Sequence, residues 1–259
     1  MRTHCRSIIL IAGLSVSLGA CGAGMQLSQQ HANIAQMQEE IARCRATAGT
    51  APGGFTSCTA TRGPQLAKGA KEGLDEASRT ANRATRVALY AASANGGWES
   101  GTAEGFQTAD TAIQAGTAEC GKFAANEFLP PRDCALLRVG PGFVVHMRTM
   151  ALLDRIEVKR PAAVSAAERQ QLAEASTRYV KNTFDYVEIQ RSQFAADPNL
   201  DIAFLTMLDG QRAVFYCTSL HLVTATRRLG QVETSRRVSR DRDRMITAAP
   251  ALRAQTCTG

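Results

Sequence analysis

Few residues of this 259-residue chain have a type and spacing that point to chemistry. Asp185 and Glu188 lie three positions apart on one face of a predicted helix, and could supply half of a carboxylate metal site. A di-metal helical bundle also needs a Glu-x-x-His repeat, which the sequence lacks. The GxSxG, HExxH, Walker and GxGxxG motifs are missing as well. We therefore assign no catalytic residue, no metal ligand and no cofactor, and favour a non-enzymatic protein.

The histidines and the single tryptophan have structural interpretations. His146 and His221 lie beside apolar residues in predicted helices, where we expect hydrogen-bonded imidazoles in the core or at its boundary. His31 lies in a glutamine-rich helix near the N-terminus. Trp98 follows a Gly-Gly pair, and we expect it to be a packing anchor, with an exposed recognition residue as the alternative.

The N-terminus carries export signals. Arg2 and Arg6 precede a short apolar run at residues 8–14, and Leu18-Gly19-Ala20-Cys21 follows. This order resembles the lipobox of bacterial lipoproteins, over residues 1–21 only. The resemblance implies a signal peptide at residues 1–20, cleavage before Cys21 and fatty acylation of that cysteine, with residues 21–24 as a short tether. Gly22 after the cysteine favours the outer over the inner membrane, with the body facing the periplasm or the cell surface.

Six of the 8 cysteines remain after Cys5 and Cys21 are set aside. An even number of cysteines in an exported chain indicates disulfides, because the periplasm is oxidising. Fifteen pairings are possible, but 13 residues separate Cys44 from Cys58 and 13 separate Cys120 from Cys134, and each interval is rich in turn residues. We therefore predict the pairs 44–58, 120–134 and 217–257. A metal or redox site is the alternative, and no CxxC spacing supports it.

Helical periodicity dominates the rest of the chain. Small residues recur every three or four positions from Ala70 to Ala91, which predicts one helix over 66–94 with a narrow seam for close packing. Asn95-Gly96-Gly97 is expected to end it, and Pro141 to begin a later helix. Ser165 with Glu168 forms a capping box, and Asp197-Pro198 is expected to cap another helix. The sequence predicts an all-α, irregular bundle of about seven helices, with a tetratricopeptide-like array as the alternative.

The excess positive charge lies near the C-terminus. Without Arg2 and Arg6 the net charge is +5, and residues 227–253 account for it. A solvated helix face is the plain interpretation; a patch for anionic headgroups or other polyanions is the alternative. The arginines of that patch would be Arg227, Arg228, Arg236, Arg237, Arg240 and Arg244. Nucleic acid is not expected, since the chain is exported and no aromatic residues alternate with these arginines.

These observations predict a helical domain over 25–226 and a basic helix and tail over 227–259. A composition of 44% hydrophobic and 20% charged residues excludes a disordered or polytopic membrane protein. We expect a lipid-anchored scaffold that contacts another envelope protein. The alternative is a periplasmic enzyme or small-ligand-binding protein. A pocket with convergent Asp, Glu and His groups and perturbed ionisation would favour that alternative, and a groove without them the scaffold.

Overall fold

The computed structural model describes residues 34–45, 47–48, 51–123, 130–197 and 199–257. Within these ranges the regular structure is entirely helical, which confirms the all-α prediction. After a first helix at residues 34–45 the α-helices are α2 (Gly54–Arg79), α3 (Arg83–Glu99), α4 (Ala103–Cys120), α5 (Pro131–Glu157), α6 (Ala166–Val180), α7 (Tyr186–Phe194), α8 (Ile202–Arg228) and α9 (Val232–Ala248). Short 3₁₀ helices occupy Pro161–Ala163 and Pro250–Ala254, and a π-helical turn at Lys181–Asp185 joins α6 to α7.

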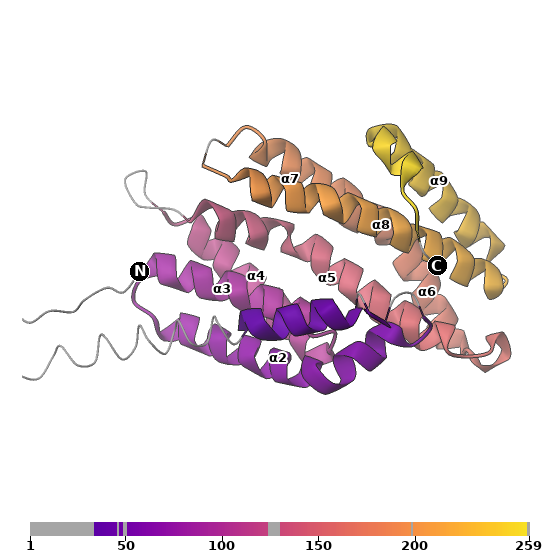
Figure 1. Ribbon diagram of the computed structural model, residues 1–259, viewed down its shortest axis with the longest axis horizontal. Coiled ribbons are helices and arrows are strands. Elements are labelled where there is room, and N and C mark those ends of the chain that lie inside the picture. The colour runs from indigo at the N-terminus through magenta and orange to yellow at the C-terminus, as the bar shows by residue number, and fades with distance from the viewer. Residues whose placement is uncertain (1–33, 46, 49–50, 124–129, 198, 258–259) are drawn as a thin grey trace, which may run out of the picture.

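Helix α5 is the centre of the bundle. It contacts α2, α3 and α4 on one side and α6, α7 and α8 on the other (Figure 1). Helix α9 packs on α6 and α8, at the end of the molecule away from α2 and α3. The main core is continuous from Ala77 to Leu252, whereas Ile34, Ile41, Cys58 and Leu66 form a small second cluster under the first helix. The helices vary from 9 to 27 residues, so no 34-residue unit repeats along them.

The expected small-residue seam is found only in part, and it is divided between two helices. Ala70, Ala77 and Ala91 are buried, yet the chain leaves the helix at residues 80–82 and begins α3. The cause is local: the Asn82 side chain accepts a hydrogen bond from the backbone N–H of Thr85, which caps α3. The prediction of one helix over 66–94 is therefore wrong at this point.

Glycines inside α3 allow close helix packing instead of ending the helix. The helix continues through Gly96 and Gly97 to Glu99. A Cβ atom at Gly97 would lie 2.6 Å from the carbonyl oxygen of Gly105 on α4 and 2.9 Å from the Ala109 nitrogen. Because only a hydrogen fits there, Gly97 fixes the close approach of α3 and α4. The predicted helix end at 95–97 is therefore wrong, because these glycines are used for close packing inside α3.

Two other expected helix boundaries change and one is confirmed. Pro141 lies inside α5, which begins at Pro131. The N-cap of α8 is Asp201, whose side chain accepts from the Phe204 N–H, rather than Asp197. The capping box of Ser165 and Glu168 is confirmed at the start of α6, where both reciprocal hydrogen bonds form.

Candidate functional site

A large cavity lies between α3, α5 and α8, next to the start of α2. Its volume is about 540 Å³, within the range of small-molecule sites. Aromatic and aliphatic side chains form most of its wall, from Phe55, Trp98, Leu136, Phe143, Met147, Met150, Phe204, Met207 and Val214. Asn95, Gln211, Thr218 and His146 add polar groups, and Arg45, Glu99, Arg132 and Asp133 add charged ones. We call this space the main cavity.

The aromatic wall is rigid because its rings pack on each other. Trp98 is buried, and its ring lies 5.4 Å from that of Phe143 between centroids. Phe143 in turn lies 6.2 Å from Phe215 in the core. These tilted arrangements are the favourable ones for aromatic pairs. Trp98 is therefore the packing anchor that we expected, and it also faces the main cavity.

His146 is the titratable group most deeply placed in the main cavity wall. Its Nδ1 atom lies 2.8 Å from the Tyr179 hydroxyl, and no hydrogen bond within the described part of the chain engages its Nε2 atom. Burial, and to a smaller extent the positive charge of Arg45, lower the pKa of His146 to about 3. Burial also raises the pKa of Tyr179 above its ordinary value. Both groups are therefore neutral at pH 7, and the Nε2 atom of the imidazole can form one hydrogen bond with a ligand.

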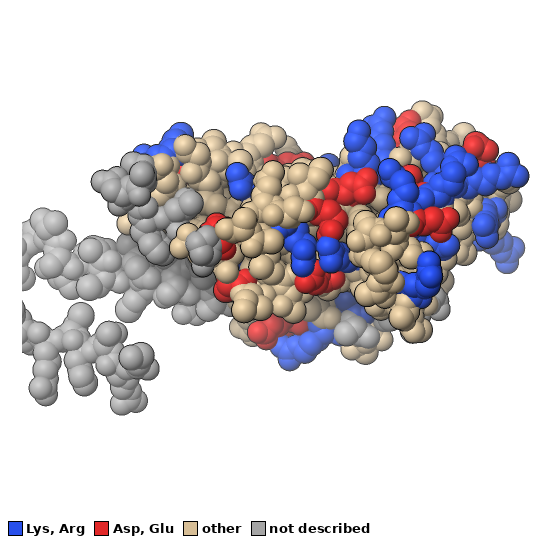
Figure 2. All heavy atoms as spheres, turned by 90° about the horizontal axis from the view of Figure 1, so that it is seen from above, with Lys and Arg blue, Asp and Glu red and all other residues tan. Residues whose placement is uncertain are grey.

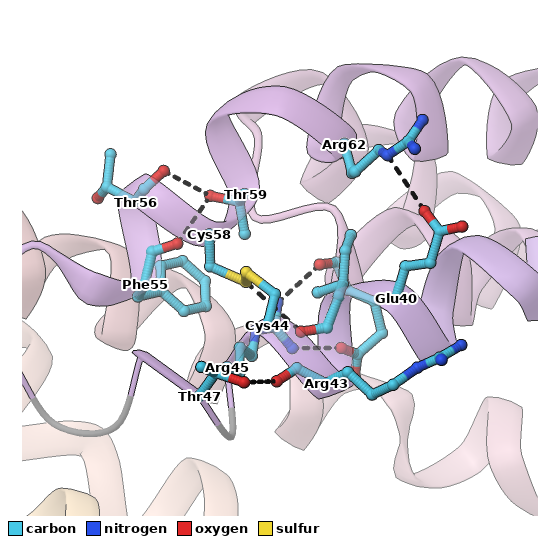
Figure 3. The surroundings of a disulfide bond; sticks show 12 residues. Glu40, Arg43, Cys44, Arg45, Thr47, Phe55, Thr56, Cys58, Thr59 and Arg62 are labelled. Carbon is cyan, nitrogen blue, oxygen red and sulfur yellow. Dashed lines mark hydrogen bonds and ion pairs between the residues drawn. A yellow bond between two sulfur atoms is a disulfide. The ribbon is translucent and has the colours of Figure 1, made fainter.

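Arg45 closes the rim of the main cavity. Its guanidinium forms an ion pair with the Glu99 carboxylate, donates to the Glu99 backbone oxygen at 2.7 Å, and lies 4.8 Å above the Phe55 ring. Arg45 follows Cys44, whose disulfide to Cys58 joins the first helix to α2 (Figure 3). Arg62 and Glu40 join the same two helices, 3.1 Å apart. The rim is thus held by a covalent bond and two ion pairs.

Two smaller cavities continue along α5 and α8. The central cavity, of about 60 Å³, shares Phe55 and Met150 with the main cavity. The outer cavity, of about 320 Å³, shares Glu157 and His221 with the central one. The His221 Nδ1 atom lies 3.9 Å from the Glu157 carboxylate, and burial raises the pKa of Glu157. His221 therefore lies at the core boundary, as expected, and beside a cavity.

The three predicted disulfides are confirmed. Cys44–Cys58, Cys120–Cys134 and Cys217–Cys257 are bonded, with Cα atoms 5.7, 6.0 and 5.3 Å apart. The last pair fixes the C-terminal tail to the middle of α8, as expected for a tail clipped to the body. Cys21, the signal peptide, the tether and His31 lie outside the described residues.

The six predicted patch arginines have different environments. The Arg227 Nε atom donates to Ser235, and Arg228 donates to the carbonyl oxygens of Ile156, Glu157 and Lys159 at the end of α5. Arg244 pairs with Asp185 and Asp241. The exposed Arg236, Arg237 and Arg240 are left on the outer face of α9, two of them within 4.0 Å of Glu233.

The outer face of α9 is nevertheless the most basic surface in view. Figure 2 shows Lys and Arg side chains gathered over the end of the molecule that carries α9. All six predicted arginines are exposed. Arg227, Arg228 and Arg244 also contact other elements of the fold, whereas Arg236, Arg237 and Arg240 contact α9 alone and are the candidate contacts for an anionic partner.

Arginine side chains engage both carboxylates of the Asp185 and Glu188 pair. Glu188 accepts two hydrogen bonds from the Arg212 guanidinium, one of them of 2.6 Å, and Asp185 lies beside Arg244. Within the described ranges, no three His, Cys, Asp or Glu residues are grouped so that they could hold a metal ion. These carboxylates therefore connect α7 to α8 and the π-helical turn to α9.

Apart from Trp98 and His146, the sequence did not indicate the residues that line the main cavity. Arg45, Phe55, Glu99 and Gln211 come from four different helices, and no spacing links them in the sequence. A partial signal exists on α8, where Phe204, Met207, Gln211, Val214 and Thr218 recur every three or four positions. That period reports one helix face, and it does not say whether the face is packed or open.

Comparison with known proteins gives no further identification. No protein family, no curated protein and no solved structure matches the chain. Across the described residues, no helix combines the length and the apolarity needed to cross a bilayer.

Proposed function

We propose that this chain is a lipid-anchored, non-enzymatic binding protein of the bacterial cell envelope that holds a small, mostly apolar molecule in the main cavity. One observation carries the proposal: a cavity of about 540 Å³ with an aromatic and methionine wall and a few polar groups, among them Glu99, Asp133 and a neutral His146. Such a cavity was the feature expected of a small-ligand-binding protein rather than of a scaffold.

The cavity favours binding over turnover. The Glu99 carboxylate is engaged by Arg45, and His146 is held neutral by burial, its Nδ1 atom beside Tyr179. A general base needs a pKa near the working pH, and the pKa of His146 lies far below it. An ion-paired Glu99 and a neutral His146 are suited to hydrogen-bonding a ligand.

The sole tryptophan provides the assay. Trp98 lines the main cavity, so its fluorescence should change when a ligand enters. We expect a saturable, one-to-one change with small apolar probes such as toluene or indane, confirmed by calorimetry. Gln211→Phe should fill part of the cavity and weaken binding, whereas Gln193→Phe adds the same ring on the exposed face of α7 and should not. Equal binding by both variants would refute the proposed site.

The anchor and the location are separate parts of the proposal, supported by the lipobox resemblance. Acylation at Cys21 would fix the body at the outer membrane more readily than at the inner one, facing the periplasm or the cell surface. Mass spectrometry of membrane fractions should find an acylated Cys21 at the start of the mature chain. A soluble chain that begins elsewhere would contradict this part and leave the cavity untouched.

Contact with an envelope protein or an anionic surface is the second candidate function. The observation that favours it is the exposed row of Arg236, Arg237 and Arg240 on α9. Binding of a Cys21→Ala chain to anionic vesicles should then weaken steeply with salt, because each such arginine contributes about 1 kcal/mol near a charged surface. Binding that salt does not change would remove this candidate.

A further inference from the structure

Another cavity lies where α5 faces the start of α2 and the turn between α3 and α4. Its volume is about 480 Å³. Phe55 also lines the main cavity, but Trp98 and His146 do not line this one. Two arginines of α5, Arg148 and Arg155, do, and no acidic residue of the described chain belongs to its wall. We call this space the arginine cavity.

Small and apolar groups shape the hollow between the two arginines. Ala151 lies three positions after Arg148 and four before Arg155, so its methyl group leaves space between two long side chains on one face of α5. The buried ring of Phe106 forms another part of the wall. The Thr59 hydroxyl donates to carbonyl oxygens within α2, the shorter bond being 3.1 Å (Figure 3). The wall therefore offers apolar contact to a ring or an alkyl group.

Arg155 is a free cation in this wall. Its side chain is exposed, and no hydrogen bond or ion pair within the described residues engages its guanidinium. A guanidinium carries its N–H donors in one plane, and a parallel pair of them matches the two oxygens of a carboxylate. Beside a cavity wall such a pair is screened less by water than on an open surface. Arg155 can therefore bind an anion without breaking a bond of the fold.

Arg148 is held in place but only partly used. Its Nη2 atom donates to the Asp110 carboxylate at 2.5 Å, and its guanidinium lies 5.6 Å from the centroid of the Phe106 ring. The Nε and Nη1 atoms make no hydrogen bond within the described residues. One carboxylate thus serves two arginines, and one net positive charge is left at the arginine cavity. A carboxylate ligand balances that charge, whereas a phosphate monoester carries more than one negative charge at neutral pH.

We propose that the arginine cavity binds a small organic monocarboxylate. Its carboxylate meets the Arg155 guanidinium, and its apolar body lies over Ala151 against the rings of Phe55 and Phe106. Arg148 supplies further positive charge from the same face of α5. The ligand of this site is an anion, and its binding does not depend on the main cavity. The inference therefore goes beyond the proposed function and stands or falls independently of it.

The test uses the full chain carrying Cys21→Ala and three probes with one ring but different charge: benzoate, benzyl alcohol and benzylammonium. We expect saturable benzoate binding in calorimetry, about tenfold tighter than that of benzyl alcohol, and no binding of benzylammonium. Amide NMR signals of Thr56, Ala103 and Arg155 should shift with benzoate, because these residues line the arginine cavity. The indole N–H signal of Trp98, which lines the main cavity, should not.

The first matched pair removes one positive charge at two places. Arg155→Gln takes it from the arginine cavity, and Arg178→Gln takes it from an exposed position of α6 that lines none of the four cavities described. Both variants should unfold as the unsubstituted chain does, because neither guanidinium forms a hydrogen bond or ion pair within the described residues. We expect Arg155→Gln to weaken benzoate binding about tenfold and Arg178→Gln to leave it unchanged.

The second pair predicts a gain of affinity. Asp110→Asn removes the carboxylate that competes with the ligand for Arg148, so benzoate should bind about threefold tighter. The gain should be larger for phenyl phosphate, because the site then carries more positive charge than one carboxylate balances. Asp75→Asn is the control: Asp75 pairs with Lys71 at 3.2 Å and lies about 24 Å along α2 from Thr59, by the rise per residue of an α-helix. It should not change the affinity.

Four results would overturn the inference. Equal benzoate binding by Arg155→Gln and Arg178→Gln would show that Arg155 does not hold the anion. Benzyl alcohol that binds as tightly as benzoate would remove the need for a charge. Phenyl phosphate that binds the unsubstituted chain more tightly than benzoate would exclude the monocarboxylate. Benzoate shifts confined to the Trp98 indole would place the anion in the main cavity instead.

Discussion

Acidification should destabilise the fold through His146. Burial lowers the pKa of this imidazole from 6.5 to about 3, so below pH 6.5 the unfolded chain takes up a proton that the folded chain refuses. The contribution of the neutral imidazole to stability is complete above pH 6.5, and it is lost as the pH falls towards 3. From these two pKa values the free energy of unfolding should drop by about 2 kcal/mol at about pH 5 relative to neutral pH.

The assay is denaturant unfolding of the oxidised protein at about pH 7.5 and about pH 5, compared with a His146→Asn variant. Asparagine has no pKa in this range and keeps a polar atom near the Tyr179 hydroxyl. The variant should be less stable than the wild type at both pH values. Its own loss of unfolding free energy between the two pH values, however, should be about 2 kcal/mol smaller than that of the wild type. If wild type and variant lose equal stability on acidification, His146 is not the buried neutral group that the structure describes.

Two pairs of matched variants test the packing and the rim. Gly97→Ala should lower the free energy of unfolding by about 1–3 kcal/mol, because its Cβ would meet the α4 backbone. Gly210→Ala in α8, with no atom within 4 Å of the new Cβ, should instead raise it by up to about 1 kcal/mol, and equal signs would contradict the packing described. We would also replace either Cys44 and Cys58 or Cys120 and Cys134 by serine. Both disulfides join cysteines 14 positions apart, so the loss of either should lower the free energy of unfolding by about 3 kcal/mol. Only the first pair should also weaken ligand binding in the main cavity, since it positions Arg45 and Phe55; equal effects on affinity would show that the rim is not needed.

The fold class and the disulfides could be predicted from local patterns. Helical spacing, the Ser165 capping box and the short intervals between cysteines all depend on residues close in sequence. The helix boundaries that were predicted wrongly depend on side-chain capping of a new helix or on packing against a helix distant in sequence. Asn82 interrupts the seam because its side chain caps a new helix, and Gly97 remains helical because α4 approaches it closely.

The cavity could not be predicted, for a physical reason. Arg45 and Glu99 are 54 positions apart, and His146 and Tyr179 are 33 positions apart. Each of these side chains alone is compatible with an ordinary solvent or core position. A cavity remains only where α3, α5 and α8 pack incompletely, and its size depends on the summed volume of the side chains from all three helices.

Two of the disulfides bracket connections between consecutive helices, from the first helix to α2 and from α4 to α5. A protease that cuts the backbone within either bracket leaves both fragments covalently attached. Such a nicked chain would migrate as one species without reductant and separate into two with it. The molecule can therefore survive a cleavage there as a single covalently linked body.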